Sequence, residues 1–335
     1  MAVRVAINGF GRIGRLVLRS IIEHNRSDVE VVGINDLGSP EANAHLIKYD
    51  SVHGVLPADV SVVGDVMTIG SRSMKVVAER DPTKLPWKAL GVDICMECTG
   101  IFTDKEKAQV HLEAGAKRVL VSAPSKNADL TVVYGVNHTK LTPEHRVVSN
   151  ASCTTNCLSP VAAVLQQLCG ITHGFMTTIH SYTGDQRTVD TLHKDLRRAR
   201  ASALNMIPTS TGAAKAVGEV LPELKGKLDG VAIRVPTPNV SLVDLKCVVK
   251  RSVSRDEINT AMKNTAGGPM KGVLAYTESD MVSSDFNHNA VSSIFDATGT
   301  KVIDGNFVRV MAWYDNEWGF STRMADTAVT WGKLI

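Results

Sequence analysis

Hydrophobic and polar positions follow two different rhythms along the chain. In the first half, short apolar runs alternate with segments in which apolar residues recur every three or four positions. Residues 2–7 are typical of a buried strand, and the apolar residues of 16–22 then fall on one face of a helix. Strands that alternate with helices predict a parallel, doubly wound sheet. Further strands are expected at 29–34, 60–63, 66–69, 74–78, 92–97, 118–121, 131–134 and 147–148, and helices at 41–49 and 105–114.

After residue 170 the pattern changes. Residues 175–182 alternate as in a strand with one covered face. Residues 183–208 form a polar, basic stretch with little regular pattern, and a stretch of this length is usually either functional or disordered. Long strands with few helices between them predict a mostly antiparallel sheet. The fold class expected is therefore α/β, with an N-terminal doubly wound sheet and an α+β second domain. Strands are expected at 230–235, 242–249, 292–296 and 307–314, and helices after 209–212, after Ser254 and at 317–334.

A glycine pattern stands between the first strand and the first helix. Gly9, Gly11 and Gly14 have the dinucleotide-binding spacing, and the second strand ends at Asp36. The first glycine makes the turn, the second admits a pyrophosphate, and the third lets the helix pack on the strand. Asp36 is placed to accept hydrogen bonds from ribose hydroxyls and would repel a 2′-phosphate. The sequence thus predicts a Rossmann-type domain that binds NAD rather than NADP.

A cysteine begins the helix that follows the strand at 146–148. The helical pattern starts near Cys153, with Ser152 as its N-cap and Gly170 at its end. Backbone N–H groups and the helix dipole there favour a thiolate, whereas Cys157, one turn later, is assigned to the core. A cysteine at a helix start often only packs. The hydroxyl and amide side chains around this one favour a nucleophile.

Two other residues are candidates for chemistry with this cysteine. His180 ends the strand at 175–182 among hydroxyl residues and is the best base, although alone it would be an ordinary surface group. Arg234 interrupts an apolar strand, where a charge needs a partner such as a substrate anion. The histidines form no metal-binding pair of the H-E-x-x-H type, so no metal site is expected.

Composition excludes several classes of function. The 335 residues are 44% hydrophobic and 21% charged, which is ordinary for a two-domain globular protein. The net charge of +3 comes from scattered Lys and Arg, so nucleic acid is not expected as the main partner. No apolar run could span a bilayer, the N-terminus opens as a strand, and the six cysteines lie mostly in apolar runs. A cytoplasmic protein without a membrane partner is expected.

Six motifs carry a resemblance to a known family. They run from the first strand to the last helix and include the highly specific cysteine stretch. The chain resembles the phosphorylating glyceraldehyde-3-phosphate dehydrogenases at 8–15 (NGFGRIGR), 149–156 (SNASCTTN), 180–186 (HSYTGDQ), 196–200 (LRRAR), 211–216 (TGAAKA) and 313–319 (WYDNEWG).

The resemblance implies a function and a role for each matching residue. It implies glycolytic or gluconeogenic, NAD-dependent oxidative phosphorylation of D-glyceraldehyde 3-phosphate by a cytoplasmic homotetramer. Cys153 would form a hemithioacetal and then a thioester, with His180 as its base. The substrate phosphate would meet Thr183, Asp185 and Arg234, and inorganic phosphate would meet Ser152, Thr154, Arg198, Thr211 and Gly212. NAD would lie against Gly9, Gly11, Arg12, Ile13, Gly14, Asp36, Arg80, Thr99, Gly100, Phe102, Ser122 and Asn316.

The implied domains are 1–151 with 316–335 for NAD and 152–315 for catalysis. As imidazolium, His180 would raise the thiolate fraction of Cys153 before accepting a proton. Erythrose-4-phosphate dehydrogenase shares the fold and the catalytic pair and is the alternative within this class. A cysteine hydrolase would leave the dinucleotide motif and two anion sites without purpose. RNA binding at the basic stretch is disfavoured as the main function, since it lacks interleaved aromatic residues.

Overall fold

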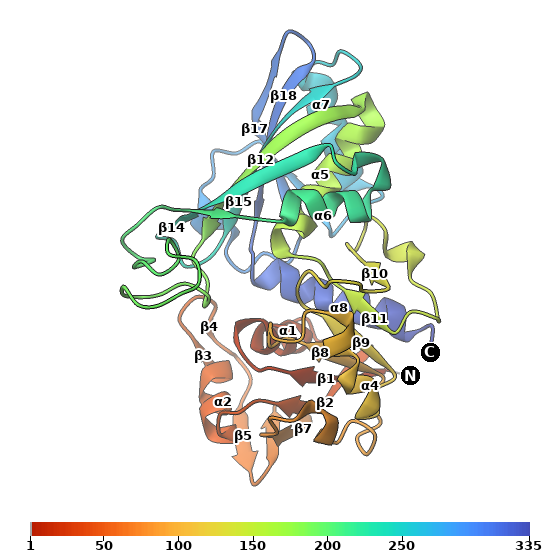
Figure 1. The fold of residues 1–335 in the computed structure, drawn as a ribbon, viewed down its shortest axis with the longest axis vertical. Helices are drawn as coiled ribbons and strands as arrows, with labels where there is room; N and C mark the ends of the chain where they lie inside the picture. The colour runs from red at the N-terminus through yellow and green to blue at the C-terminus, as the bar shows by residue number, and fades with distance from the viewer. Residues whose placement is uncertain (1) are drawn as a thin grey trace. The chain divides into compact units, whose positions relative to one another are not determined.

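The computed structural model describes residues 2–335, which form two compact units (Figure 1). Unit 1 runs to Val132 and adds His138–Ala151 and Ser321–Ile335. Unit 2 comprises Val133–Asn137 and Ser152–Phe320. The division falls within the last helix, α8 (Trp318–Gly332).

Unit 1 contains the doubly wound sheet that the sequence predicts. Its nine strands have the order β10-β11-β9-β8-β1-β2-β7-β6-β5, parallel from β10 to β7 and antiparallel from β7 to β5. The strands are β1 (Val3–Asn8), β2 (Val29–Asn35), β5 (Val60–Val63), β6 (Val66–Ile69), β7 (Arg72–Val77), β8 (Ile94–Glu97), β9 (Arg118–Val121), β10 (Leu130–Thr131) and β11 (Val147–Ser149). The helices are α1 (Arg12–Glu23), α2 (Pro40–Lys48), α3 (Lys105–Ala108) and α4 (Val110–Glu113). Strands β3 (Tyr49–Asp50) and β4 (Gly54–Val55) form a separate antiparallel pair.

Two expected elements of unit 1 are shorter than the sequence pattern suggests. The helix expected at 105–114 is split into α3 and α4. The strand expected at 131–134 ends after Thr131, because the backbone N–H of Val133 donates to the side-chain oxygen of Asn137 at 2.8 Å. A side chain has therefore replaced the neighbouring strand as hydrogen-bond partner.

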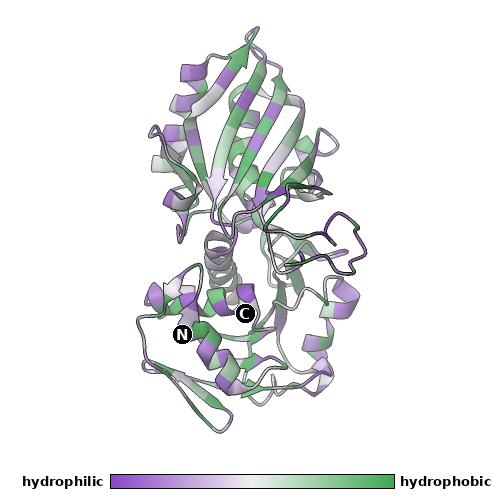
Figure 2. Ribbon diagram, turned by 90° about the vertical axis from the view of Figure 1, so that its left-hand side faces the viewer, coloured by the Kyte–Doolittle hydropathy of each residue, from purple (hydrophilic) through white to green (hydrophobic). Residues whose placement is uncertain are grey.

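Unit 2 is built on a seven-stranded, mostly antiparallel sheet, as predicted. The order is β13-β14-β12-β15-β18-β17-β16, in which only the β12–β14 and β16–β17 pairs are parallel. Side chains of β15 alternate strictly between buried and half-buried. Figure 2 shows hydrophobic and hydrophilic residues interspersed along the strands of this sheet. The strands are β12 (Ile171–Ser181), β13 (Ile207–Ser210), β14 (Leu228–Val235), β15 (Ser241–Val249), β16 (Leu274–Thr277), β17 (Ser293–Ile303) and β18 (Phe307–Tyr314).

Three helices pack against this sheet, namely α5 (Cys153–Cys169), α6 (Ala213–Val220) and α7 (Arg255–Gly267). The predicted capping box of α7 is confirmed: Ser254 Oγ accepts from the Glu257 N–H at 3.2 Å, and the Glu257 carboxylate accepts from the Ser254 N–H at 2.8 Å. Strands β13 and β16 were not expected, since residues 183–208 were assigned to a polar stretch and no element was assigned to 274–277. Among residues 2–335, no helix has the length and apolarity needed to cross a membrane.

Candidate active site

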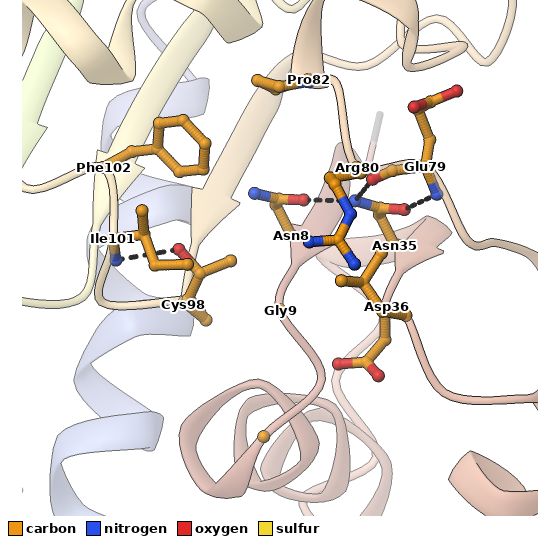
Figure 3. A pocket seen from close by; sticks show the side chains of 13 residues that line it. Asn8, Gly9, Asn35, Asp36, Glu79, Arg80, Pro82, Cys98, Ile101 and Phe102 are labelled. Atoms are coloured by element: carbon orange, nitrogen blue, oxygen red, sulfur yellow. Dashed lines mark hydrogen bonds between the residues drawn. The ribbon is translucent and has the colours of Figure 1, made fainter. Parts of the chain in front are cut away.

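A cavity of about 520 Å³ opens in unit 1 where the carboxyl ends of the parallel strands meet (Figure 3). Six of the residues expected at the cofactor line it, which are Gly9, Gly11, Asp36, Arg80, Thr99 and Phe102. The other lining residues are Asn8, Asn35, Leu37, Glu79, Pro82, Cys98 and Ile101. Sequence reasoning missed this second set, although Asn8 and Asn35 close strands β1 and β2 and Cys98 directly follows β8.

Each of the three glycines has the spatial role that its position in the motif predicts. Gly9 has φ +90°, and a Cβ there would lie 2.7 Å from the Thr99 nitrogen. A Cβ on Gly11 would meet nothing within 4 Å, so this position faces open space at the cavity wall. A Cβ on Gly14 would lie 2.1 Å from the Gly9 carbonyl oxygen, which prevents any larger residue where α1 packs on the turn. The cradle therefore fits a pyrophosphate.

The Asp36 carboxylate is fixed at the cavity by two backbone donors. Oδ2 accepts from the Phe10 N–H at 2.8 Å, and Oδ1 accepts from the Gly38 N–H at 2.9 Å. An acceptor-only group held in this way suits the hydroxyls of a ribose and opposes a phosphate. The residues present therefore fit NAD.

Six other expected cofactor residues do not line this cavity. Arg12 forms an ion pair with Asp50 at 2.5 Å, and Gly14 packs α1 against the preceding turn. Asn316 belongs to unit 2, where its Oδ1 accepts from the hydroxyls of Ser181 at 2.8 Å and Ser241 at 2.9 Å. With its oxygen engaged, Asn316 keeps its amide N–H groups for another partner. The remaining three are Ile13, Gly100 and Ser122.

The predicted catalytic residues come together in unit 2. Cys153 opens α5, whose N-cap Ser152 accepts from the Thr155 N–H at 3.0 Å. His180 lies near the end of β12, in register with Arg234 on the parallel strand β14. The Cys153 sulfur lies 3.6 Å from His180 Nε2. A guanidinium nitrogen of Arg234 lies 2.9 Å from His180 Nδ1 on the other side of the ring.

Burial, rather than the helix start, dominates the ionisation of this cluster. It raises the pKa of the Cys153 thiol above its ordinary value, although the Arg234 cation acts in the opposite direction. Burial, with the Arg234 cation as the second cause, lowers the pKa of His180 to about 3. Both shifts oppose the expected pair of thiolate and imidazolium and favour a neutral thiol beside a neutral imidazole.

His180 Nδ1 has two partners that compete for it. It lies 2.7 Å from the Ser181 carbonyl oxygen and 2.9 Å from Arg234. A protonated Nδ1 donates to Ser181 and leaves Nε2 bare to accept a proton from Cys153, whereas an unprotonated Nδ1 accepts from Arg234 and places the proton on Nε2. Arg234 Nε is itself buried without a hydrogen-bond partner among residues 2–335. An anion that drew Arg234 away would favour the form of the ring that can act as a base.

The residues expected at the two phosphates take varied positions. Asp185 and Arg198 form a direct ion pair, and Arg198 also approaches Asp195 at 3.6 Å. Thr211 Oγ1 accepts from the Ala213 N–H at 3.2 Å, next to the exposed Gly212 at the start of α6. Thr154 is buried and shares a 2.8 Å hydrogen bond with the Tyr314 hydroxyl, while Thr183 is half-exposed.

Comparison with known proteins covers both units. Residues 3–105 match the family model described as glyceraldehyde 3-phosphate dehydrogenase, NAD binding domain, and residues 152–316 match that of the C-terminal domain. The chain is 66% identical to glyceraldehyde-3-phosphate dehydrogenase of Xanthobacter flavus and 65% identical to that of Cereibacter sphaeroides, with 100% of each chain covered. It is 59% identical to that of Zymomonas mobilis, again over both full lengths. The chain belongs to the glyceraldehyde-3-phosphate dehydrogenase family and is an NAD-dependent dehydrogenase.

Proposed function

We propose that this enzyme converts D-glyceraldehyde 3-phosphate, inorganic phosphate and NAD to 1,3-bisphosphoglycerate, in glycolysis or gluconeogenesis, through a covalent intermediate on Cys153. The observation that carries the proposal is the 3.6 Å approach of the Cys153 sulfur to His180 Nε2, with Arg234 on the far side of the ring. A nucleophile and a cation thus contact the two ring nitrogens of one base.

The chemistry begins with a neutral thiol. As Cys153 attacks the aldehyde carbon, His180 Nε2 takes the thiol proton and passes it to the aldehyde oxygen, which gives a hemithioacetal. The Cys153 backbone N–H and the His180 ring would stabilise the oxyanion, a kind of contact worth about 3–4 kcal/mol. NAD, when bound, supplies the hydride acceptor. His180 takes the hydroxyl proton as hydride leaves, and the carbon remains on Cys153 as a thioester.

Two anions must then be held near the cysteine. The unpartnered Nε of Arg234 supports the assignment of the substrate phosphate to Arg234, Thr183 and Asp185. Attack by inorganic phosphate on the thioester carbonyl releases the acyl phosphate and restores the thiol. We assign that phosphate to a second site, for which Arg198 must exchange its Asp185 partner. Its residues would be Ser152, Thr154, Arg198, Thr211 and Gly212.

The roles of the two units follow from this assignment. Residues 1–151 and 316–335 would bind NAD, with Asn316 donating to the carboxamide, and 152–315 would carry out catalysis. We also propose a homotetramer, because the stretch from 183 to 206 exposes large apolar side chains that a second subunit would cover. These side chains are Val189, Leu192, Leu196, Leu204 and Met206. The six free cysteines support a reducing, cytoplasmic location.

Erythrose-4-phosphate dehydrogenase is the alternative, because the same catalytic pair would oxidise either aldehyde. Relative kcat/KM on the two substrates separates them, and we expect glyceraldehyde 3-phosphate to be preferred. The covalent step is tested by incubating the enzyme with glyceraldehyde 3-phosphate and NAD without phosphate, followed by mass spectrometry of its peptides. We expect one acyl group per subunit on Cys153, lost when phosphate is added. An unmodified Cys153 after NAD reduction would contradict the thioester.

A further inference from the structure

A buried carboxylate lies beneath the dinucleotide cavity. Glu97 closes strand β8 and is 1% exposed, and its neighbours Asn8 and His111 are 2% and 0% exposed. Neither the sequence motifs nor the proposed mechanism uses Glu97 or His111. A carboxylate buried so completely needs partners for each of its lone pairs.

All four acceptor positions of Glu97 are filled. Oε1 accepts from the Thr99 backbone N–H at 2.7 Å and from the Thr99 hydroxyl. Oε2 accepts from Asn8 Nδ2 at 2.6 Å and contacts His111 Nε2 at 2.8 Å. Two of these partners, Asn8 and Thr99, line the cavity. Glu97 therefore fixes two residues of the cavity wall through hydrogen bonds, although it does not line the cavity itself.

The protonation of His111 follows from its other neighbour. Trp87 Nε1, which can only donate, lies 3.3 Å from His111 Nδ1, so Nδ1 is the acceptor and carries no proton. The proton is then on Nε2 and is donated to Glu97. With donors on every side, Glu97 is the acceptor-only group of this cluster.

The hydrogen bond from Asn8 to Glu97 also determines which groups of Asn8 and Asn35 donate and accept along the cavity wall (Figure 3). Because Asn8 donates to Glu97 through Nδ2, its Oδ1 faces Asn35 and accepts from Asn35 Nδ2 at 2.7 Å. Asn35 in turn accepts from the Glu79 N–H at 2.8 Å and donates to the Glu79 carbonyl at 2.9 Å. One carboxylate thus fixes the ends of β8, β1 and β2 and the segment after β7, all of which contribute to the wall.

We propose that Glu97 is a positioning residue that pre-organises the NAD cavity by setting the donor direction of Asn8, Asn35 and the Thr99 turn. The inference rests on NAD occupying this cavity. A glutamine in its place would have nearly the same shape, but its amide N–H groups would face other donors. Either the Thr99 N–H or the pair of Asn8 and His111 would lose its acceptor. The side chains of the cavity wall would then no longer be held in one set of hydrogen-bond directions.

The test is Glu97→Gln in the full-length enzyme, with NAD affinity measured by calorimetry. We expect the Kd for NAD to rise about tenfold, as for loss of one hydrogen bond to a charged group. Turnover at saturating NAD should stay within about twofold, and the rate of Cys153 alkylation should not change. A role in stability alone would lower the melting temperature without this separation of KM for NAD from kcat. Unchanged NAD affinity in Glu97→Gln would overturn the inference.

His111 offers a matched pair of variants. His111→Gln keeps a donor for Glu97 and an acceptor for Trp87, so NAD affinity should remain within about twofold of the wild type. His111→Leu removes both and should weaken NAD binding; equal affinities for the two variants would contradict the network. NMR of the wild-type histidine nitrogens requires no variant to fold and should show His111 protonated on Nε2 alone. A doubly protonated ring would overturn the assignment, whereas wild-type enzyme that binds no NAD would instead contradict the proposed function.

Discussion

The dinucleotide cavity and the catalytic cluster handle buried charge in opposite ways. Around Glu97, four donors occupy the four acceptor positions of one carboxylate, and the bond directions are determined without a ligand. Around Arg234, one guanidinium nitrogen is buried without a hydrogen-bond partner in the part of the chain that the structure describes, and His180 Nδ1 lies between two groups that require different protonation. The first site has its hydrogen bonds filled within the protein, and we propose that an anion completes the second.

The difference suits the two tasks. A large cofactor gains affinity when the pocket needs no reordering. A catalytic cluster gains rate when its charges are best arranged with the reacting substrate present rather than absent. Four changes to the catalytic cluster or its pH should separate it from the dinucleotide cavity, and the largest expected effect comes first.

The largest effect is expected from Cys153→Ser. A serine hydroxyl in a buried site beside a neutral imidazole is a much weaker nucleophile, so turnover should fall by at least about 10⁴-fold. NAD affinity should remain that of the wild type, because Cys153 does not line the dinucleotide cavity and is not among the residues assigned to NAD. Cys157→Ser is the matched control: that thiol lies 3.6 Å from Ser293 Oγ in the core, and a hydroxyl can keep the contact. Retained turnover in Cys153→Ser would rule out the nucleophile.

His180→Asn should lower kcat by about 10²–10⁴-fold, since general acid–base catalysis typically contributes that much. The control is His173→Asn, on the same strand but exposed, which should leave kcat unchanged. Steady-state rates at saturating substrates measure both. If the two variants lost activity equally, His180 would not be the catalytic base. The competition of Ser181 and Arg234 for its Nδ1 would then have no effect on catalysis.

Arg234→Leu should lower kcat/KM for glyceraldehyde 3-phosphate by about 10–100-fold, because one charge-assisted contact to a phosphate is lost. Unphosphorylated glyceraldehyde is the control substrate, and its much lower rate should change less. The ratio of the two specificity constants is the measurement. An equal loss on both aldehydes would show that Arg234 acts on the cysteine and histidine alone, not on the substrate anion.

The smallest effect for a single step, about tenfold for each unit, concerns pH. Because burial raises the pKa of the Cys153 thiol, the thiolate is the minor form below that pKa, and its fraction should fall about tenfold for each pH unit. Alkylation by iodoacetamide should therefore still be accelerating at pH 9, with no step between pH 5 and 8, since the pKa of His180 is lowered to about 3. A rate that is flat from pH 6 to 9 would instead demonstrate a thiolate–imidazolium pair.

The sequence predicted the elements that local patterns determine. The glycine turn, the N-cap Ser152 and the capping box at Ser254 are each set by a few neighbouring residues, and all are confirmed. The pairing of Cys153 with His180 was inferred from chemistry, and their 3.6 Å approach confirms that they are close. The resemblance implied a place for Arg234 near the substrate phosphate, and the structure shows it in contact with His180.

What the sequence could not provide depends on distant contacts. The ionisation of Cys153 was judged from the helix start, but burial by unit 2 outweighs that local effect. Glu97 gave no signal, because a single acidic residue at a strand end is common and its partner His111 comes from a different element. Strand β16 was missed for the same reason, since it depends on pairing with β17. The early end of β10 has a local cause, the hydrogen bond from the Val133 N–H to Asn137, which the apolar pattern alone does not show.

The most direct test of the account is steady-state NAD reduction with glyceraldehyde 3-phosphate, with and without inorganic phosphate. We predict sustained turnover that requires phosphate and, in its absence, a burst that stops near one equivalent per subunit. Phosphate-independent turnover would mean that water releases the product and that the second anion site does not exist. No NAD reduction by an enzyme that binds NAD would contradict the proposed substrate.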